Sequence, residues 1–325
     1  MVLDRDRQQL KSGPSNAPML VGNHAMEGIG YGCVWDGPNY SCTYDSVFMV
    51  TFSAYRYANS PWRQGWQDSS NFNKMLGCFF NSILTTVWIP LLRRQLPSLF
   101  NTYQDQVRDH LSAINPISFP CLGQNKIAVS DIFVHICHFE GNCPLVSLKF
   151  TCHNRSHQPQ TKEYSVAFIL LVHNMSPAAR SFTEKPTLQL WLSSYFCKIQ
   201  AKRHQCRLCD IPHYHSSFSV VPLPWIWIDV PPGGDQLFMM SMALTLEQES
   251  SSNTSYTLAG IVYAGMGHFL ARFMDTSGRW WAYDGMVNSG QLLLNPITED
   301  AQLTTLGDQV MHILLYYLNL SILPL

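Results

Sequence analysis

Apolar and polar residues follow two different patterns along this chain. Between about 42 and 113, apolar residues recur at helical spacings in three stretches: 42–58, 71–89 and 97–113. The second stretch ends before Pro90 and the third before Asn115-Pro116, where a helix is expected to end. We therefore predict that the first third of the chain is helical.

After Pro120 the pattern changes to short runs that are rich in β-branched and aromatic residues. These runs predict strands at 127–129, 132–136, 145–151, 164–173, 188–196 and 218–221. An edge or irregular strand is expected at 221–229, because Pro222 and Pro224 cannot donate ladder hydrogen bonds. Trp225 and Trp227 alternate there as in core packing on a strand.

The clearest strands lie near the end of the chain, at 256–263, 268–274 and 279–283. The last two are joined by Asp275-Thr-Ser-Gly278, which has the composition of a hairpin turn. The segment 309–320 fits a last strand or a short helix. Helices first and antiparallel strands afterwards predict an α+β fold class. We read residues 1–30 as a polar lead-in and 31–325 as a single domain.

Composition and charge exclude several classes of protein. The chain is 46% hydrophobic and 12% aromatic with 13% charged residues, so it is not a disordered chain. Its net charge of −1 predicts no basic surface for nucleic acid or for an acidic membrane. The longest apolar run, 83–92, is interrupted and too short to cross a bilayer. We expect a monomer in the cytoplasm or nucleus, with neither a nucleic-acid nor a membrane partner.

The unusual residues are 10 cysteines and 12 histidines. No apolar signal segment opens the chain, so a reducing compartment is expected, where cysteines more often ligate metal or do chemistry than form disulfides. One cysteine, Cys42, follows a loop of turn formers and would lie in the first turn of the 42–58 helix. Free backbone N–H groups and the helix dipole favour a thiolate there. The alternative is a small buried residue at a helix start.

A histidine and an aspartate flank the hairpin near the end of the chain. His268 opens one predicted strand and Asp284 follows the other, so the turn at Ser277-Gly278 would bring them side by side. A carboxylate beside an imidazole stabilises the imidazolium that a Cys-His pair needs. Gly265 and Gly267 would let an extended peptide approach the histidine closely. The alternative is a solvent-facing hairpin in which both residues are incidental.

The two segments together resemble the signature boxes of the ubiquitin-specific proteases, which are papain-like cysteine isopeptidases. The family's cysteine box has the form G-N-T-C-Y-M-N-S, and this chain reads Asn39-Tyr-Ser-Cys42-Thr-Tyr-Asp45-Ser46. The histidine box is matched by Tyr256-Thr-Leu-Ala-Gly260, Gly267-His268-Phe and Trp280-Trp-Ala-Tyr-Asp284. The cysteine box is similar in form to those of divergent members, such as SUMO isopeptidases and variants found beside fungal transposons.

The resemblance implies a role for each matching residue. Cys42 would be the nucleophile, His268 the general base and then acid, and Asp284 the residue that orients the imidazole. The family places an oxyanion-hole Asn about five residues before the nucleophile, where this chain has Gly37. Asn39 is then the expected donor, because an amide can donate to a developing oxyanion. A capping or turn role for Asn39 is the alternative.

A zinc site is expected between the two boxes. Cys206-Arg-Leu-Cys209 is a C-x2-C knuckle, and Cys152 and His157 lie about fifty residues earlier. Two pairs of N/S ligands from separated segments are typical of a structural zinc site, and the family's fingers region often carries two such pairs. The expected ligands are Cys152, His157, Cys206 and Cys209. His153, Cys197 or His204 would be substitutes, and reduced cysteines without metal are the alternative.

The resemblance also implies an architecture and an activity. We expect a helical thumb at about 31–125, β fingers within about 145–222, and a palm made of the surrounding strands and 223–325. The implied reaction is thiol-dependent cleavage after the C-terminal glycine of ubiquitin or of a ubiquitin-like modifier such as SUMO. The alternative is an inactive module of the same fold that binds a ubiquitin-like protein or another partner.

Overall fold

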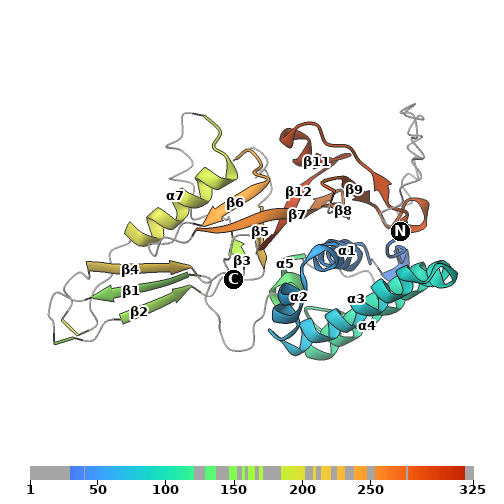
Figure 1. Ribbon diagram of the computed structural model, residues 1–325, viewed down its shortest axis with the longest axis horizontal. Coiled ribbons are helices and arrows are strands. Elements are labelled where there is room, and N and C mark those ends of the chain that lie inside the picture. Colours follow the sequence, from blue (N-terminus) through green and yellow to red (C-terminus); the bar gives the residue numbers. More distant parts are fainter. Residues whose placement is uncertain are drawn as a thin grey trace, which may run out of the picture.

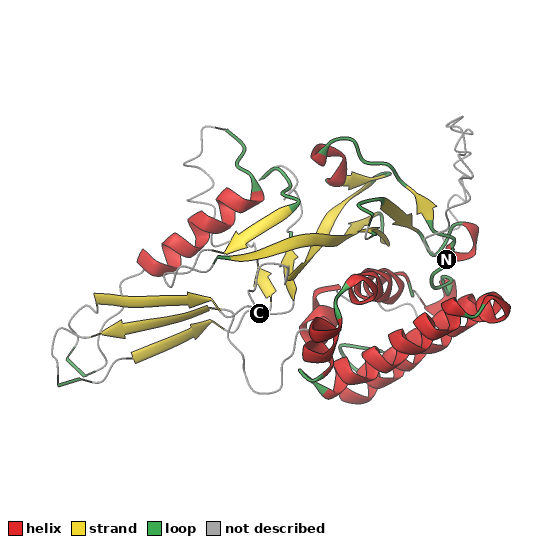
Figure 2. Ribbon diagram, viewed as in Figure 1, coloured by secondary structure: helices red, strands yellow, loops and turns green. Residues whose placement is uncertain are grey.

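The computed structural model describes most of the helical part and of the sheet beside it. The described residues are 30–39, 41–120, 129–136, 146–151, 156–157, 160–164, 168–170, 184–201, 208–209, 214–220, 225–230, 238–246, 253–275 and 277–318. A group of helices packs on one side of a large sheet, and a smaller sheet extends away from both (Figure 1). Helices and mainly antiparallel strands confirm the predicted α+β class (Figure 2).

The helical part is formed by α1 (Cys42–Tyr57), α2 (Ser60–Gln67), α3 (Asn71–Trp88), α4 (Leu96–Ile114) and α5 (Val129–Ile136), with short 3-10 turns at Gly37–Asn39 and Pro90–Gln95. The three predicted helices are confirmed as α1, α3 and α4. Helix α2 was not predicted. It is capped by Asn59, whose side chain accepts a hydrogen bond from the Trp62 backbone N–H at 2.9 Å.

Helix α1 lies between the other helices and the sheet (Figure 1). It contacts β7 and β8 on one side and α3, α4 and α5 on the other, so residues 41–56 are all buried. Gly260 on β7 makes this close packing possible. A Cβ atom there would come within 2.7 Å of Val50 on α1. The helix that begins at Cys42 is therefore held on every side.

The large sheet contains nine described strands. Seven follow the order β10-β9-β8-β7-β12-β5-β3, while β6 pairs with β7 and β11 with β12. Their bounds are β3 (Phe168–Leu170), β5 (Trp225–Asp229), β6 (Ala243–Leu246), β7 (Thr254–Gly265), β8 (His268–Met274), β9 (Trp280–Tyr283), β10 (Leu293–Leu294), β11 (Thr305–Leu306) and β12 (Gln309–Leu318). The predicted late strands are confirmed, and the segment from 309 is a strand. Every pair is antiparallel except β3 with β5.

Two predicted strands are wrong, because both segments are helical. Residues 132–136 lie in α5, and 188–196 lie in α7 (Leu188–Ala201). Of the strand predicted at 127–129, only Val129 is described, and it too lies in α5. In α5 the buried apolar residues are Val129, Ile132, Phe133 and Ile136, which is the spacing of one helix face. In α7, Leu188, Trp191 and Leu192 show the same spacing. The sequence-based prediction gave more weight to the aromatic and β-branched residues of these segments than to the helical spacing of their apolar residues.

The edge or irregular strand predicted at 221–229 is also corrected. Over the described residues of this segment, strand β5 (Trp225–Asp229) is regular and lies inside the sheet, between β12 and β3. Pro222 and Pro224 lie outside the described residues. Core packing of the alternating tryptophans is confirmed. Trp225 and Trp227 belong to the core on the helix side, whereas Ile226 and Ile228 belong to the core on the opposite face.

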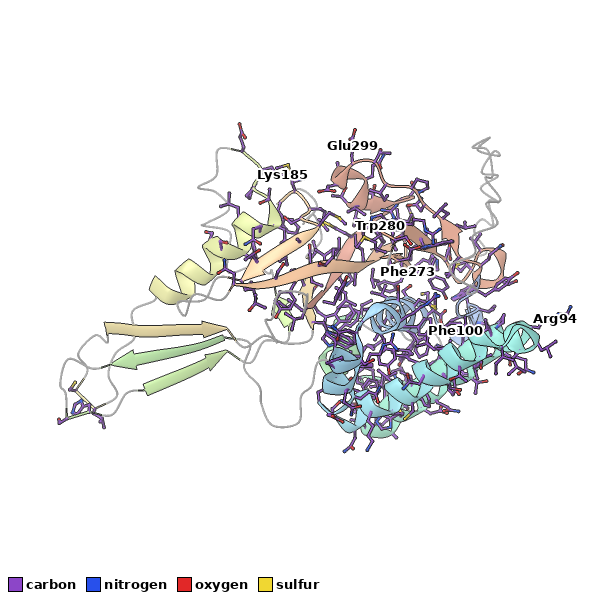
Figure 3. All side chains as sticks on the ribbon, in the orientation of Figure 1. Arg94, Phe100, Lys185, Phe273, Trp280 and Glu299 are labelled. Atoms are coloured by element: carbon purple, nitrogen blue, oxygen red, sulfur yellow. The ribbon has the colours of Figure 1, made fainter. Side chains whose placement is uncertain are left out.

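The two cores cover both faces of the large sheet. The first joins the helices to the sheet, and Phe100 and Phe273 point into it from α4 and β8 (Figure 3). The second lies on the other face, where Trp280 and residues of α7 pack. A sheet that is buried on both faces gives the hairpin of β8 and β9 a rigid support. Among the described residues, no helix is long and apolar enough to cross a membrane.

The small sheet has the order β2-β1-β4, formed by β1 (Val146–Thr151), β2 (Gln160–Tyr164) and β4 (Tyr214–Val220). Both pairs are antiparallel. Strand β1 confirms the prediction at 145–151 over its described residues, and β4 confirms the one at 218–221 up to Val220 but begins earlier, at Tyr214. The single strand predicted at 164–173 is observed as the end of β2 and, at 168–170, as β3. The remaining residues of that prediction lie outside the described ones.

Candidate active site

Cys42 is the first residue of α1 and its side chain is buried, with 5% of its surface exposed. At the N-terminus of a 16-residue helix, the first backbone N–H groups have no acceptor within the helix, and the helix dipole has its positive end there. Both favour a negative charge at this position. The local setting expected for a reactive thiol is therefore present.

His268 is placed by a two-residue hairpin turn between β7 and β8. Gly265 pairs with His268, and the turn residues Met266 and Gly267 both have positive φ, at 51° and 77°. Two successive positive φ angles match the right-handed twist of the flanking strands. Gly267 supplies one of these angles without steric cost, and no atom lies within 4 Å of its Cβ position.

The ring of His268 is bonded to Asp284. Nε2 of His268 donates to Oδ1 of Asp284 at 2.9 Å, and the backbone N–H of Met286 donates to the same oxygen at 2.9 Å. The two residues are not directly opposite, because the β8–β9 register pairs Ala271 with Tyr283. They are diagonal neighbours on one face of the hairpin, which is within reach of long side chains. The predicted juxtaposition is confirmed with this shift in register.

His268 interacts with Cys42 as well as with Asp284, and both interactions affect its pKa. Burial by itself lowers the pKa of His268, but hydrogen bonding to Asp284 and Cys42, and the negative charges on both, raise the pKa to about 9. Because Asp284 occupies Nε2, the other ring nitrogen, Nδ1, is the one that can face the thiol. The structure therefore brings Cys42, His268 and Asp284 together.

A segment before the nucleophile fastens the helix start to the hairpin. Residues 30–35 run beside 285–292, with backbone hydrogen bonds from Gly32 N to Gly290 O at 2.9 Å and from Trp35 N to Gly285 O at 3.1 Å. The hydroxyl of Tyr283 donates to the Cys33 carbonyl at 2.8 Å. Sequence reasoning treated this stretch as loop and missed these contacts. Their pairing partner lies 250 residues away, so no local pattern could indicate them.

The oxyanion position remains a prediction. Asn39 lies in the 3-10 turn Gly37–Asn39, but its side chain is outside the described part of the structure. At Gly37, a Cβ atom would come within 2.8 Å of the Trp35 ring. The indole thus fills the space that a longer side chain would need at 37. An amide donor at that position would require Trp35 to move.

An extended peptide has less room to approach His268 over Gly265 and Gly267 than the sequence indicates. The space where a side chain of Gly265 would lie is filled by the Gln309 side chain from β12. Gly265 is therefore needed for packing against Gln309. Of the two glycines, only Gly267 has free space at the position of a Cβ atom. Met266, between them, is 94% exposed and lies next to His268.

Two of the four predicted zinc ligands lie outside the described residues. These are Cys152 and Cys206, whereas His157 and Cys209 are described. Among the described residues, no three His, Cys, Asp or Glu side chains are grouped so as to hold a metal ion. Thr151 of β1 pairs with Tyr214 of β4. These two described residues, one just before Cys152 and one five residues after Cys209, therefore lie at the same end of the small sheet.

Two polar residues near Cys42 were missed by the sequence reasoning. Ser41 precedes the nucleophile, and Asp45 lies one helical turn after it. The Ser41 hydroxyl donates to Asp45 Oδ2 at 2.7 Å, and both side chains are fully buried. The spacing of four between a hydroxyl and a carboxyl at a helix start was visible in the sequence. Their burial was not, because an acid in the first turn is usually solvated.

Comparisons with known proteins identify the fold. No protein-family model and no curated protein match the sequence. Among solved structures, the SAGA DUB module of Ubp8, Sgf11, Sus1 and Sgf73 bound to monoubiquitin is similar at 13% identity and a TM-score of 0.53, covering 90% of this chain and 70% of that chain. The Saccharomyces cerevisiae apo Pan2 pseudoubiquitin hydrolase–RNA exonuclease module with AAGGAA RNA has 10% identity and a TM-score of 0.48, covering 89% and 53%.

The likeness to the first of these structures concerns the fold. At 13% identity it shows a ubiquitin-protease-like α+β fold, the class that the two sequence boxes had indicated. The cysteine at a helix start and the His-Asp pair on the hairpin are this chain's own features. A functional proposal for this chain therefore rests on these side chains and not on the similarity in fold.

Proposed function

We propose that this chain is a cysteine hydrolase that cleaves after the C-terminal glycine of ubiquitin or of a ubiquitin-like modifier such as SUMO. The observation that carries the proposal is the meeting of Cys42, at the N-terminus of α1, with the bonded pair of His268 and Asp284. The ubiquitin-protease-like fold supports a modifier of this kind as the substrate.

In the proposed reaction the Cys42 thiolate attacks the carbonyl carbon of the terminal glycine. An S–C bond forms while the C–N bond to the leaving amine breaks, and His268 gives its proton to that amine. His268 then takes a proton from water, which attacks the thioester and releases the glycine carboxylate. Asp284 keeps the imidazole oriented and stabilises its charged form through the 2.9 Å hydrogen bond.

Backbone N–H groups at the start of α1 would stabilise the oxyanion of the tetrahedral intermediate, together with the Asn39 amide. We assign the helical group to the thumb at about 31–125, the small sheet to the fingers within about 145–222, and the large sheet to the palm. The extension of the small sheet away from the helices supports this assignment (Figure 1). Substrate glycines would pass between thumb and palm, over Gly267.

The decisive experiment uses C-terminal electrophiles of ubiquitin and of SUMO. The wild-type chain is expected to form a covalent adduct with at least one of them, and peptide mass spectrometry should place it on Cys42. Cys42→Ala should form no adduct, and His268→Ala should react at least a hundredfold more slowly, because no base activates the thiol. Cys78→Ala is the matched control, since Cys78 is exposed on α3 and lies outside the site. An adduct that persists in Cys42→Ala would contradict the assignment.

A second candidate is a catalytically inactive module that binds a ubiquitin-like protein or another protein partner. Gly37 favours it, because the Trp35 ring fills the place of the side chain that would donate to an oxyanion. Binding of ubiquitin or SUMO in titration calorimetry, with no cleavage of any modifier fusion and no adduct at Cys42, would establish this alternative. Turnover of one fusion that is lost in Cys42→Ala would exclude it.

We also propose that Cys152, His157, Cys206 and Cys209 hold a structural zinc ion. Three sulfur donors and one imidazole form a donor set that suits tetrahedral zinc, and the pairing of Thr151 with Tyr214 near the two segments supports the proposal. The ion would stabilise this end and would take no part in the chemistry. Elemental analysis should find about one zinc per chain, lost in Cys206→Ser together with thermal stability. A metal-free wild-type chain would contradict the site.

A further inference from the structure

Asp45 is a fully buried acid that the proposed mechanism does not use. It lies three residues after Cys42 in α1, so the two side chains are neighbours on one face of the helix. A buried acid one turn from a reactive thiol needs a physical explanation, because a carboxylate is rarely buried without a partner of opposite charge.

The contacts of Asp45 connect it to the loop before the nucleophile. Oδ2 of Asp45 accepts a hydrogen bond from the Ser41 hydroxyl at 2.7 Å, and the Ser41 hydroxyl oxygen accepts one from the Asp36 backbone N–H at 2.7 Å. The Asp45 N–H also donates to the Ser41 carbonyl at 2.9 Å. A continuous chain of hydrogen bonds therefore runs from residue 36 through residue 41 into the first turn of α1.

The same carboxyl group lies against the turn that follows β9. A Cβ atom on Gly285 would come within 3.3 Å of Asp45 Oδ2, and Gly285 is the residue after Asp284. The carbonyl of Gly285 accepts a hydrogen bond from the Trp35 N–H at 3.1 Å. The Asp45 side chain, in the first turn of α1, thus contacts Ser41 before the nucleophile and lies close to the turn that follows Asp284.

The surroundings do not suit a charged carboxylate. Oδ1 of Asp45 has no hydrogen-bond partner among the described residues, and one bond for two oxygens is too little to hold a buried charge. Burial raises the pKa of Asp45 well above its usual value, although the Ser41 hydrogen bond and the charges of Arg108 and His268 act in the opposite direction. The other titratable groups that interact with Asp45 are Asp105, Cys33 and Tyr283.

We propose that Asp45 is a positioning residue of this site: its uncharged carboxyl group holds Ser41, and with it the start of α1 at Cys42, against the turn that carries Asp284. The inference depends on the proposed function in taking Cys42 as the nucleophile. It also explains why the group should stay neutral. A carboxylate on the same helix face, one turn away, would repel the Cys42 thiolate.

The test compares rates of Cys42 alkylation by iodoacetamide at pH 7, followed by intact and peptide mass. The variants are Asp45→Asn, which keeps the shape without a charge, Asp45→Ala, Ser41→Ala and the double variant with both alanines. Asp131→Asn is the matched control, because Asp131 is an exposed acid on α5. Circular dichroism and thermal melting select a temperature at which every compared variant is folded.

We expect Asp45→Asn and Asp131→Asn to react within threefold of wild type. Asp45→Ala and Ser41→Ala should each react at least tenfold more slowly, and the double variant should be no slower than either single one, because both changes break the same link. Rescue by asparagine but not by alanine is the signature of a neutral positioning group.

Two outcomes would overturn the inference. If Asp45→Asn reacts as slowly as Asp45→Ala, the charged carboxylate, and not the neutral carboxyl group, supports the reactivity of Cys42. If all variants react like wild type, Asp45 positions nothing. Should Asp45→Ala fail to fold, the comparison of Asp45→Asn with Ser41→Ala decides. Iodoacetamide needs no modifier, so failure of the ubiquitin and SUMO electrophiles with the alkylation pattern intact would contradict the proposed substrate and leave this inference standing.

Discussion

The hydrogen bond between His268 and Asp284 allows a quantitative prediction. The side chains are 18% and 29% exposed, so the 2.9 Å contact is only partly screened by water. The pKa of His268 is about 9 rather than the usual 6.5, which corresponds to about 3 kcal/mol in favour of the imidazolium. Asp284 and Cys42 share this effect, because both raise the pKa through a hydrogen bond and a charge.

Asp284→Asn removes the charge of the partner and keeps an oxygen that can accept from Nε2. If Asp284 supplies about half of the effect, the pKa of His268 should fall to between about 7 and 8. Alkylation of Cys42 by iodoacetamide at pH 7 should then be about tenfold slower, since each 1.4 kcal/mol is a factor of ten. Asp284→Ala should have a larger effect, because it also removes the hydrogen bond.

The pKa of His268 can be measured by NMR titration of the histidine ring signals, with the His268 signal assigned from its loss in His268→Gln. Asp300→Asn is the control, because Asp300 is exposed in the 3-10 helix Asp300–Leu303. Since the folded pKa is above the unfolded one, the pair stabilises the fold fully below about pH 6.5, and this stability is lost as the pH rises to about 9. Asp284→Asn should reduce that loss. An unchanged pKa of His268 in Asp284→Asn would refute the reasoning.

Three further predictions concern stability. Asp275 accepts four hydrogen bonds, including one from Trp281 Nε1 at 3.0 Å, so Asp275→Ala should lower the free energy of unfolding by about 2–4 kcal/mol in urea titrations. These bonds lower the pKa of Asp275, so wild type should lose their stabilisation as the pH falls below about 4, and the variant should lack this loss. Phe80 is fully buried against Phe52 and Trp66, and Phe80→Ala should cost about 3–5 kcal/mol, whereas a cost under 1 kcal/mol would contradict this packing. The pKa of Asp45 is raised, so the folded chain keeps this group protonated while the unfolded chain ionises it, and the stability of wild type therefore falls as the pH rises above the unfolded pKa of about 4; Asp45→Asn does not titrate and should gain stability relative to wild type between pH 5 and 7, by up to about 1.4 kcal/mol per pH unit, and a pH-independent difference would contradict a buried neutral acid.

Much of the fold could be predicted where local period and turn chemistry agree. Helices α1, α3 and α4 and strands β7, β8 and β9 have clear periods and are bounded by prolines, glycines or turn formers. The predictions failed where these signals conflict. Helices α5 and α7 are rich in residues that favour strands, and only the burial of one face by the neighbouring core makes them helical.

The sequence by itself determined the chemical groups of the site. A cysteine at a helix start and a His-Asp pair around a hairpin turn are local patterns, because each depends on residues that are close along the chain. The tertiary structure alone decided how these groups meet. The contact of residues 30–35 with 285–292 and the burial of Asp45 against Gly285 both join segments that are far apart in sequence. Such contacts depend on the packing of α1 against β7 and β8, and that packing has no signature in any short stretch of the chain.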